Sequence, residues 1–222
     1  MSWTDSVAVE NIMKLRREFH LDIAIETGTF KGVNAELYSL LFPRVLTCEI
    51  KQEYFKLAQK RLSSCHNVET YLASSPEFLA SLPHNLRCFI YLDAHFYDPE
   101  NATKWVVVEE LKAMKKWDYC VLCVHDFDNG MGHLIYDGEH LDFKLIGKYL
   151  KDVNPHFHYY TNTECNPFTE ESIKHLPITI DEDVLDAIRF VHSTPERKNR
   201  GMLFATPWSI ELERYKLKEI YP

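Results

Sequence analysis

The chain has 222 residues, of which 45% are hydrophobic and 26% charged, and its formal net charge is −8. These values are typical of one globular domain that is long enough to bury a core. No basic run is longer than residues 197–200. Because phosphate binding needs clustered Lys and Arg, we expect no nucleic-acid partner and no anionic membrane surface as a partner.

The sequence also bears on location and on the state of the cysteines. Its first residues lack the charged and apolar regions of a signal peptide, and no apolar stretch approaches the roughly eighteen residues of a membrane span. Most of the six cysteines lie inside apolar runs, where thiols are usually buried and reduced. We therefore expect a cytoplasmic protein.

Residues 7–19 have the apolar spacing of a helix that packs on a sheet. A short apolar run, residues 23–26, then ends in Glu26 and is followed by Gly28, Gly32 and a helical pattern over residues 33–42. A strand, a glycine turn and a helix in this order are typical of a nucleotide-binding α/β unit. Glycine suits such a turn because the backbone adopts positive φ there and a Cβ would keep a ligand at a distance.

A second predicted strand, residues 45–49, ends in Glu49 about twenty residues after the glycine turn. A carboxylate at this position can accept hydrogen bonds from both hydroxyls of an adenosine ribose. The glycine spacing differs from the dinucleotide motif, because Phe30 stands where G-x-G-x-x-G requires glycine.

Strands and helices alternate through the next part of the chain, which predicts a parallel, doubly wound sheet. The expected strands are residues 68–72, 88–92, 119–124 and 157–160, and the expected helices are residues 52–62, 105–116, 143–150 and one that begins at Pro76 with Ser75 as its N-cap. Polar residues follow each strand at its carboxyl end, where ligands bind in open α/β sheets.

Residues 162–199 interrupt this alternation. We expect a short helix capped by Thr169, an extended stretch at residues 176–180 and an acid-led helix over residues 181–192, followed by a last strand at residues 201–206. The whole chain, residues 1–222, is interpreted as a single domain in which this insertion forms a substrate lid or an interaction segment such as a homodimer contact. A surface insertion without a role in binding is the alternative.

Two motifs carry a resemblance to a known family. Glu26-x-Gly28-x-x-x-Gly32 resembles motif I of the class I S-adenosylmethionine-dependent methyltransferases, and Leu92-Asp93-Ala94-His95 resembles the L-D-A-H that follows the fourth strand in one branch of them. The resemblance extends over residues 23–129. It implies an α/β fold with a doubly wound, mostly parallel seven-stranded sheet whose last strand is antiparallel.

The resemblance also implies S-adenosylmethionine as the cofactor. Glu26, Thr27 and Gly28 would contact its methionine moiety and Glu49 its ribose, while Ser74 and Ser75 would contact its adenine end. Ser74 stands where the family often has an acid, and a hydroxyl can still bond the adenine amino group. The residues expected to contact the cofactor are Glu26, Thr27, Gly28, Thr29, Phe30, Gly32, Glu49, Ile50, Ser74, Ser75 and Asp93.

Four residues are candidates for catalysis: Asp93, His95, His125 and Asp126. Asp93 and Asp126 follow strands expected to be neighbours, and both could reach one Mg²⁺ ion, with Asp128, Asn129 and His95 near enough to complete an oxygen-rich shell. Such an ion would lower the pKa of an acceptor hydroxyl. Without a metal, His95 or His125 would act as the general base.

This acid pair favours O-methylation of a small-molecule or sugar hydroxyl. Three alternatives remain open at this stage. A nicotinamide-dependent oxidoreductase would need the glycine that Phe30 replaces. A non-catalytic protein would bind S-adenosylmethionine or a partner without transferring a methyl group. A metal-dependent hydrolase would leave Glu26, Gly28 and Glu49 without a task.

Overall fold

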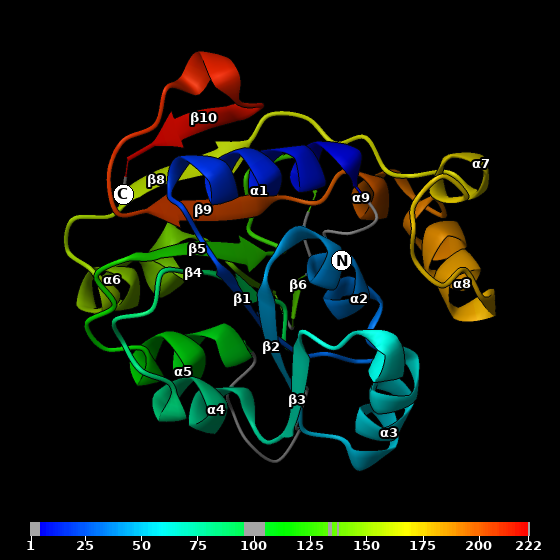
Figure 1. The fold of residues 1–222 in the computed structure, drawn as a ribbon. Coiled ribbons are helices and arrows are strands. Elements are labelled where there is room, and N and C mark those ends of the chain that lie inside the picture. The colour runs from blue at the N-terminus through cyan, green and yellow to red at the C-terminus, as the bar shows by residue number, and fades with distance from the viewer. Residues whose placement is uncertain (1–4, 96–104, 133–134, 137, 222) are drawn as a thin grey trace.

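A central sheet of eight strands lies between two layers of helices in the computed structural model, which describes residues 5–95, 105–132, 135–136 and 138–221 (Figure 1). Its strand order is β10-β8-β9-β5-β4-β1-β2-β3. The strands are β1 (Ile23–Thr27), β2 (Arg44–Glu49), β3 (Val68–Leu72), β4 (Cys88–Leu92), β5 (Cys120–His125), β8 (His158–Asn162), β9 (Met202–Thr206) and β10 (Leu217–Ile220).

The first five strands are parallel, with β1 hydrogen-bonded to both β2 and β4. β9 is antiparallel to β5 and β8, which confirms that the strand predicted at residues 201–206 is antiparallel. The predicted number of seven strands is wrong. β10 pairs with β8 from Leu217 opposite Asn162 to Ile220 opposite Tyr159, so β8 is not the edge of the sheet. The four-residue run that forms β10 was too short to be recognised.

Helices cover both faces of the sheet. One core cluster joins α4 (Ser75–Ser81), α5 (Val106–Ala113) and α6 (Phe143–Val153) to one face, and another joins α1 (Ser6–Glu18), α2 (Val33–Leu41) and α3 (Gln52–Arg61) to the other. Every residue of β4 and β5 is buried, because these strands have helices on both sides. This explains why their sequences are uninterrupted apolar runs.

Several helix starts follow from capping side chains. The carboxylates of Asp5, Asp142 and Asp181 accept backbone N–H groups at the starts of α1, α6 and α8 (Glu182–Val191). The N-cap of α4 is Ser74, not the predicted Ser75, which is already helical. Among the described residues, no helix is both long and apolar enough to cross a membrane.

Residues 162–199 contain α7 (Glu170–Ile173), α8 (Glu182–Val191) and α9 (Pro195–Lys198). Thr169 caps α7 as predicted, whereas α9 was not predicted. Val184 and Ile188 of α8 share an apolar cluster with Val33 and Leu37 of α2. Figure 1 shows α7 and α8 at one side of the molecule, beyond the carboxyl ends of the central strands.

Two smaller features complete the fold. A hairpin of β6 (Ile135–Tyr136) and β7 (Glu139–His140), which was not predicted, follows β5. All six cysteines are free. Burial raises the pKa of the Cys88 and Cys123 thiols well above the usual value, so these thiols are unreactive.

Candidate functional site

A cavity of about 650 Å³ opens at the carboxyl ends of β1, β2, β4 and β5. β1 lies between β2 and β4, and the chain runs outward from β1 in both directions, so the cavity is at the switch point of the sheet. The glycine turn and the strand ends form one part of its lining. α8 and the residues around α9 form another.

The turn after β1 depends on its two glycines. Gly28 and Gly32 have φ angles of 77° and 83°. A Cβ on Gly28 would lie 3.0 Å from the Ala94 Cα, which belongs to the segment after β4. The N–H groups of Gly28 and Thr29 both donate to the Cys48 carbonyl, at 3.0 and 2.9 Å, and fix the turn to β2.

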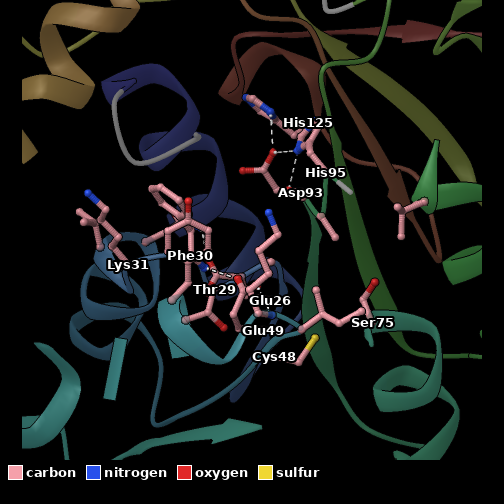
Figure 2. A pocket seen from close by; sticks show the side chains of 18 of the residues that line it. Glu26, Thr29, Phe30, Lys31, Cys48, Glu49, Ser75, Asp93, His95 and His125 are labelled. Atoms are coloured by element: carbon pink, nitrogen blue, oxygen red, sulfur yellow. Dashed lines mark hydrogen bonds and ion pairs between the residues drawn. The ribbon is translucent and has the colours of Figure 1, made fainter. Parts of the chain in front are cut away.

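Glu49 joins the end of β2 to the glycine turn. Its Oε2 accepts a hydrogen bond from the Phe30 N–H at 2.9 Å, and its Oε1 accepts one from the Lys51 N–H at 2.8 Å. Because a carboxylate has about four acceptor positions, these two bonds orient Glu49 and leave capacity for a ligand diol. Figure 2 shows Glu49 beside Glu26 and Thr29 in the cavity.

Glu26 is almost completely buried. Asn34 Nδ2 donates to its Oε1 and Thr47 Oγ1 donates to its Oε2, each at 2.6 Å. Burial raises the pKa of Glu26 to about 8, and these two hydrogen bonds oppose that rise only in part. The carboxyl group is therefore neutral near pH 7 until a cation reaches it.

Two predicted cofactor residues do not line the cavity. Thr27 is buried behind it, where its hydroxyl accepts the Asp93 N–H at 3.3 Å and connects β1 to the end of β4. Gly32 caps α2 and packs against Ala58. The remaining predicted residues all line the cavity: Glu26, Gly28, Thr29, Phe30, Glu49, Ile50, Ser74, Ser75 and Asp93.

Two acids and two histidines meet where β4 and β5 end. His125 Nδ1 lies 2.9 Å from Asp93 Oδ1 and 3.2 Å from Asp126 Oδ2. His95 Nε2 lies 2.8 Å from Asp126 Oδ2, and its Nδ1 lies 2.7 Å from the Asp93 carbonyl oxygen. All four line the cavity, and Figure 2 shows Asp93, His95 and His125 grouped together, apart from Glu49 and Ser75.

Arg200 also contacts one of the two acids, because its guanidinium donates to Asp126 Oδ1. Burial alone would favour neutral acids. The charge of His125 and its hydrogen bonds outweigh burial and hold the pKa of Asp93 and that of Asp126 below their usual values. Burial lowers the pKa of His95, but the hydrogen bond to Asp126 and the charge of Asp93 raise it to about 9.

The metal shell predicted from the sequence is only partly present. Asp93, His95 and Asp126 offer ligand atoms within 4.8 Å of one another. Asp128 is not among them, because its carboxylate contacts His140 Nδ1 at 2.7 Å and the Gly130 N–H at 3.1 Å. The prediction for Asp128 is wrong. The backbone has a φ of 59° at Asp126 and leaves the direction of β5 there, so Asp128 does not reach the cluster.

The remaining donor set fits Mg²⁺ only in part. This ion prefers an octahedron of oxygen atoms and water, whereas the cluster offers a histidine nitrogen as its third ligand atom. The Arg200 guanidinium already occupies one oxygen of Asp126. The two carboxylates are thus compensated by side chains of the protein.

Several cavity residues could not be recognised from the sequence. They come from the glycine turn, from α2 and α3, and from the 162–199 segment with the residue after it, and they include Lys31, Asn34, Tyr54, Phe190, Arg197 and Arg200. The arginines belong to the basic run at residues 197–200, but nothing local shows that this run faces the strand ends. The loop at residues 96–103, a further candidate for contact with the acceptor, lies outside the described part of the chain.

No family model matches this sequence, and no curated protein sequence matches it. Solved structures do match its fold. An O-methyltransferase from Bacillus cereus, solved in complex with S-adenosylhomocysteine, aligns with 88% of this chain and 78% of its own at 14% identity and a TM-score of 0.51. The methyltransferase domain of a bacterial Hen1 protein aligns with 88% of this chain and 95% of its own at 10% identity and a TM-score of 0.50.

Spermidine synthase from Thermotoga maritima aligns with 95% of this chain at 14% identity and a TM-score of 0.53, and the alignment spans 63% of the synthase. These likenesses confirm the fold that the sequence resemblance implied, that of the class I methyltransferases. The neighbours include a synthase as well as methyltransferases, so the fold alone does not select a reaction. The reaction therefore has to be inferred from the residues of the cavity.

Proposed function

We propose that this protein is an S-adenosylmethionine-dependent methyltransferase that methylates a hydroxyl oxygen of a small molecule. The observation that supports it is the single cavity in which a glycine turn with Glu49 adjoins the cluster of Asp93, His95 and Asp126. A cofactor bound along the turn would place its reactive end toward this cluster. The acceptor would then enter beside α8 and α9.

The glycine turn offers groups suited to each end of the cofactor. Glu49 has remaining acceptor positions for the ribose hydroxyls, and Ser75 lines the cavity beside the end of β3. Glu26 would receive the methionine ammonium, which would draw it from its neutral to its ionised form. When bound, S-adenosylmethionine supplies a methyl group on a positively charged sulfur.

The protein has to align the acceptor hydroxyl and accept its proton. We assign proton acceptance to His95. In the ligand-free protein both of its ring nitrogens lie against oxygen acceptors, as in an imidazolium ion. In its neutral form, with Nε2–H still held by Asp126, His95 presents Nδ1 to the hydroxyl in place of the Asp93 carbonyl.

His125 has a different place in this scheme. It is buried and lies between the two acids, so its ring holds Asp93 and Asp126 together. We assign it a positioning role. The scheme uses no metal ion, because the side chains of His95, His125 and Arg200 already compensate the acids.

The first experiment is isothermal titration of the purified protein with S-adenosylmethionine and S-adenosylhomocysteine, with and without Mg²⁺. We expect binding of both ligands that Mg²⁺ does not change, and turnover that survives a chelator. Absence of binding would refute the proposed function, and loss of turnover with the chelator would refute the metal-free scheme.

A His95→Gln variant separates a catalytic protein from one that only binds. If His95 accepts the proton, this variant binds S-adenosylhomocysteine normally and loses transfer. Unchanged transfer would show that another group accepts the proton. If the wild-type protein binds the cofactor and a broad acceptor screen yields no methylated product, the non-catalytic alternative is favoured.

A further inference from the structure

One wall of the cavity comes from the 162–199 segment and the residue after it. Its members are Asp183, Ala187, Phe190, Val191, Arg197 and Arg200. Two of its charges are compensated within the protein. Lys31 Nζ lies 2.5 Å from Asp183 Oδ1, and Arg200 pairs with Asp126.

Arg197 differs from these two residues. Within the described ranges, no carboxylate forms an ion pair with it. Its Nη1 donates to Ser193 Oγ at 2.7 Å, and its guanidinium carbon lies 4.1 Å from the centre of the Phe190 ring. The ring supports the plane of the guanidinium and restricts its motion. Phe190 itself is 45% exposed, so an apolar face remains open beside this charge.

The backbone that carries Arg197 is held firmly over the cluster of acids. Gly132 packs so closely against α9 that a Cβ there would lie 2.6 Å from the Glu196 carbonyl oxygen. The Gly201 N–H donates to the Gly132 carbonyl at 2.7 Å. Arg200, three residues after Arg197, is fixed to Asp126. Arg197 is therefore placed by the protein before any ligand binds.

We propose that the methyl acceptor carries a carboxylate, which Arg197 binds, and that a planar part of the acceptor lies against Phe190. The inference rests on the proposed function, because it describes the acceptor of that reaction. A guanidinium fork matches a carboxylate with two parallel hydrogen bonds. Asp183 belongs to the same wall, and its negative charge disfavours a more highly charged group such as a phosphate.

The methionine carboxylate of the cofactor is a second group that Arg197 would bind in the same way. The two possibilities are separable, because only an acceptor carboxylate leaves the affinity for S-adenosylhomocysteine independent of Arg197. The test uses 3,4-dihydroxybenzoate and catechol, which share the two hydroxyls and differ in the carboxylate. Each is titrated into wild-type protein saturated with S-adenosylhomocysteine, and methylated product is measured separately with S-adenosylmethionine.

We expect dihydroxybenzoate to bind wild-type protein about 10- to 100-fold more tightly than catechol, as a charge-assisted pair of hydrogen bonds provides. Arg197→Gln should abolish this preference with the affinity for S-adenosylhomocysteine unchanged. Arg189→Gln is the matched control, since Arg189 lies on α8 but pairs with surface acids and does not line the cavity. It should keep the preference.

Equal binding of the two probes to wild-type protein, or binding of neither, would overturn the inference. So would a preference that persists in Arg197→Gln. Weaker binding of S-adenosylhomocysteine by Arg197→Gln would assign Arg197 to the cofactor instead. Failure of the wild-type protein to bind S-adenosylhomocysteine at all is a separate result, which refutes the proposed function.

Discussion

Replacing Gly28 by alanine tests whether the glycine turn is as closely packed as the structure shows. Gly28 has a φ of 77°, and holding an alanine in this left-handed region costs about 1–2 kcal/mol. The added Cβ would also lie 3.0 Å from the Ala94 Cα and 3.2 Å from the Asp93 carbonyl oxygen. Both neighbours are backbone atoms, so relief requires moving the segment after β4, at roughly 1–3 kcal/mol more.

Gly130 provides a matched control. Its φ is 82°, but a Cβ there would meet nothing within 4 Å. Gly130→Ala should therefore lower the free energy of unfolding only by the cost of the left-handed backbone, about 1–2 kcal/mol. Gly28→Ala should lower it by roughly 2–5 kcal/mol, because the steric cost is added. The free energies of unfolding are measured by urea denaturation followed by circular dichroism. The dependence of the unfolding free energy on urea concentration is compared between the variants, because a change in it would show that more than stability differs.

The same two variants test the site. Because the turn is fixed to β2 through the Cys48 carbonyl, a shift at Gly28 displaces the Phe30 N–H that orients Glu49. We expect Gly28→Ala to bind S-adenosylhomocysteine at least about tenfold more weakly, which corresponds to about 1.4 kcal/mol. Gly130→Ala should bind normally. Equal stability and equal affinity of the two variants would refute this reasoning.

Three further predictions concern charged groups of the cavity. Glu49→Gln should weaken S-adenosylhomocysteine binding about 10- to 100-fold in isothermal titration, while Glu53→Gln on the exposed side of α3 should not change it. Binding of S-adenosylmethionine between about pH 5 and 7 should release a proton, because Glu26 with a pKa of about 8 is protonated beforehand and the ligand ammonium favours its ionised form. Titrations in buffers of different ionisation enthalpy would detect this release, and a Glu26→Gln variant that still releases it would exclude Glu26 as its source. His95 must be neutral to accept a proton, and its pKa is raised to about 9, so kcat/KM should rise with pH toward about 9. Asp126→Asn removes an acid that raises this pKa and should therefore move the midpoint of the pH profile to lower pH. An unmoved midpoint would count against His95 as the proton acceptor.

The parts of the fold that the sequence predicted well are those with local causes. Positive φ at Gly28 and Gly32 follows from the residue type, and Glu49 reaches the turn because parallel neighbouring strands end at the same edge. The buried strands β4 and β5 follow from their apolar runs.

The missed parts depend on long-range contacts. Arg200 meets Asp126 across 74 positions of the chain, and this contact forms only because the 162–199 segment returns beside the end of β5. Asp128 has the spacing of a metal ligand, but the left-handed backbone at Asp126 turns it toward His140. Spacing along the chain cannot report a change of direction of that kind.

The packing of α8 against α2 makes the two halves of the cavity dependent on each other. Lys31 of the glycine turn is paired with Asp183 of α8, and the buried Arg61 side chain bonds to Asp181 at the start of α8 and to Glu36 of α2. A ligand that stiffens the turn therefore also stiffens the wall formed by α8. Thermodynamic linkage then requires symmetry: the factor by which S-adenosylhomocysteine tightens acceptor binding equals the factor by which the acceptor tightens S-adenosylhomocysteine binding.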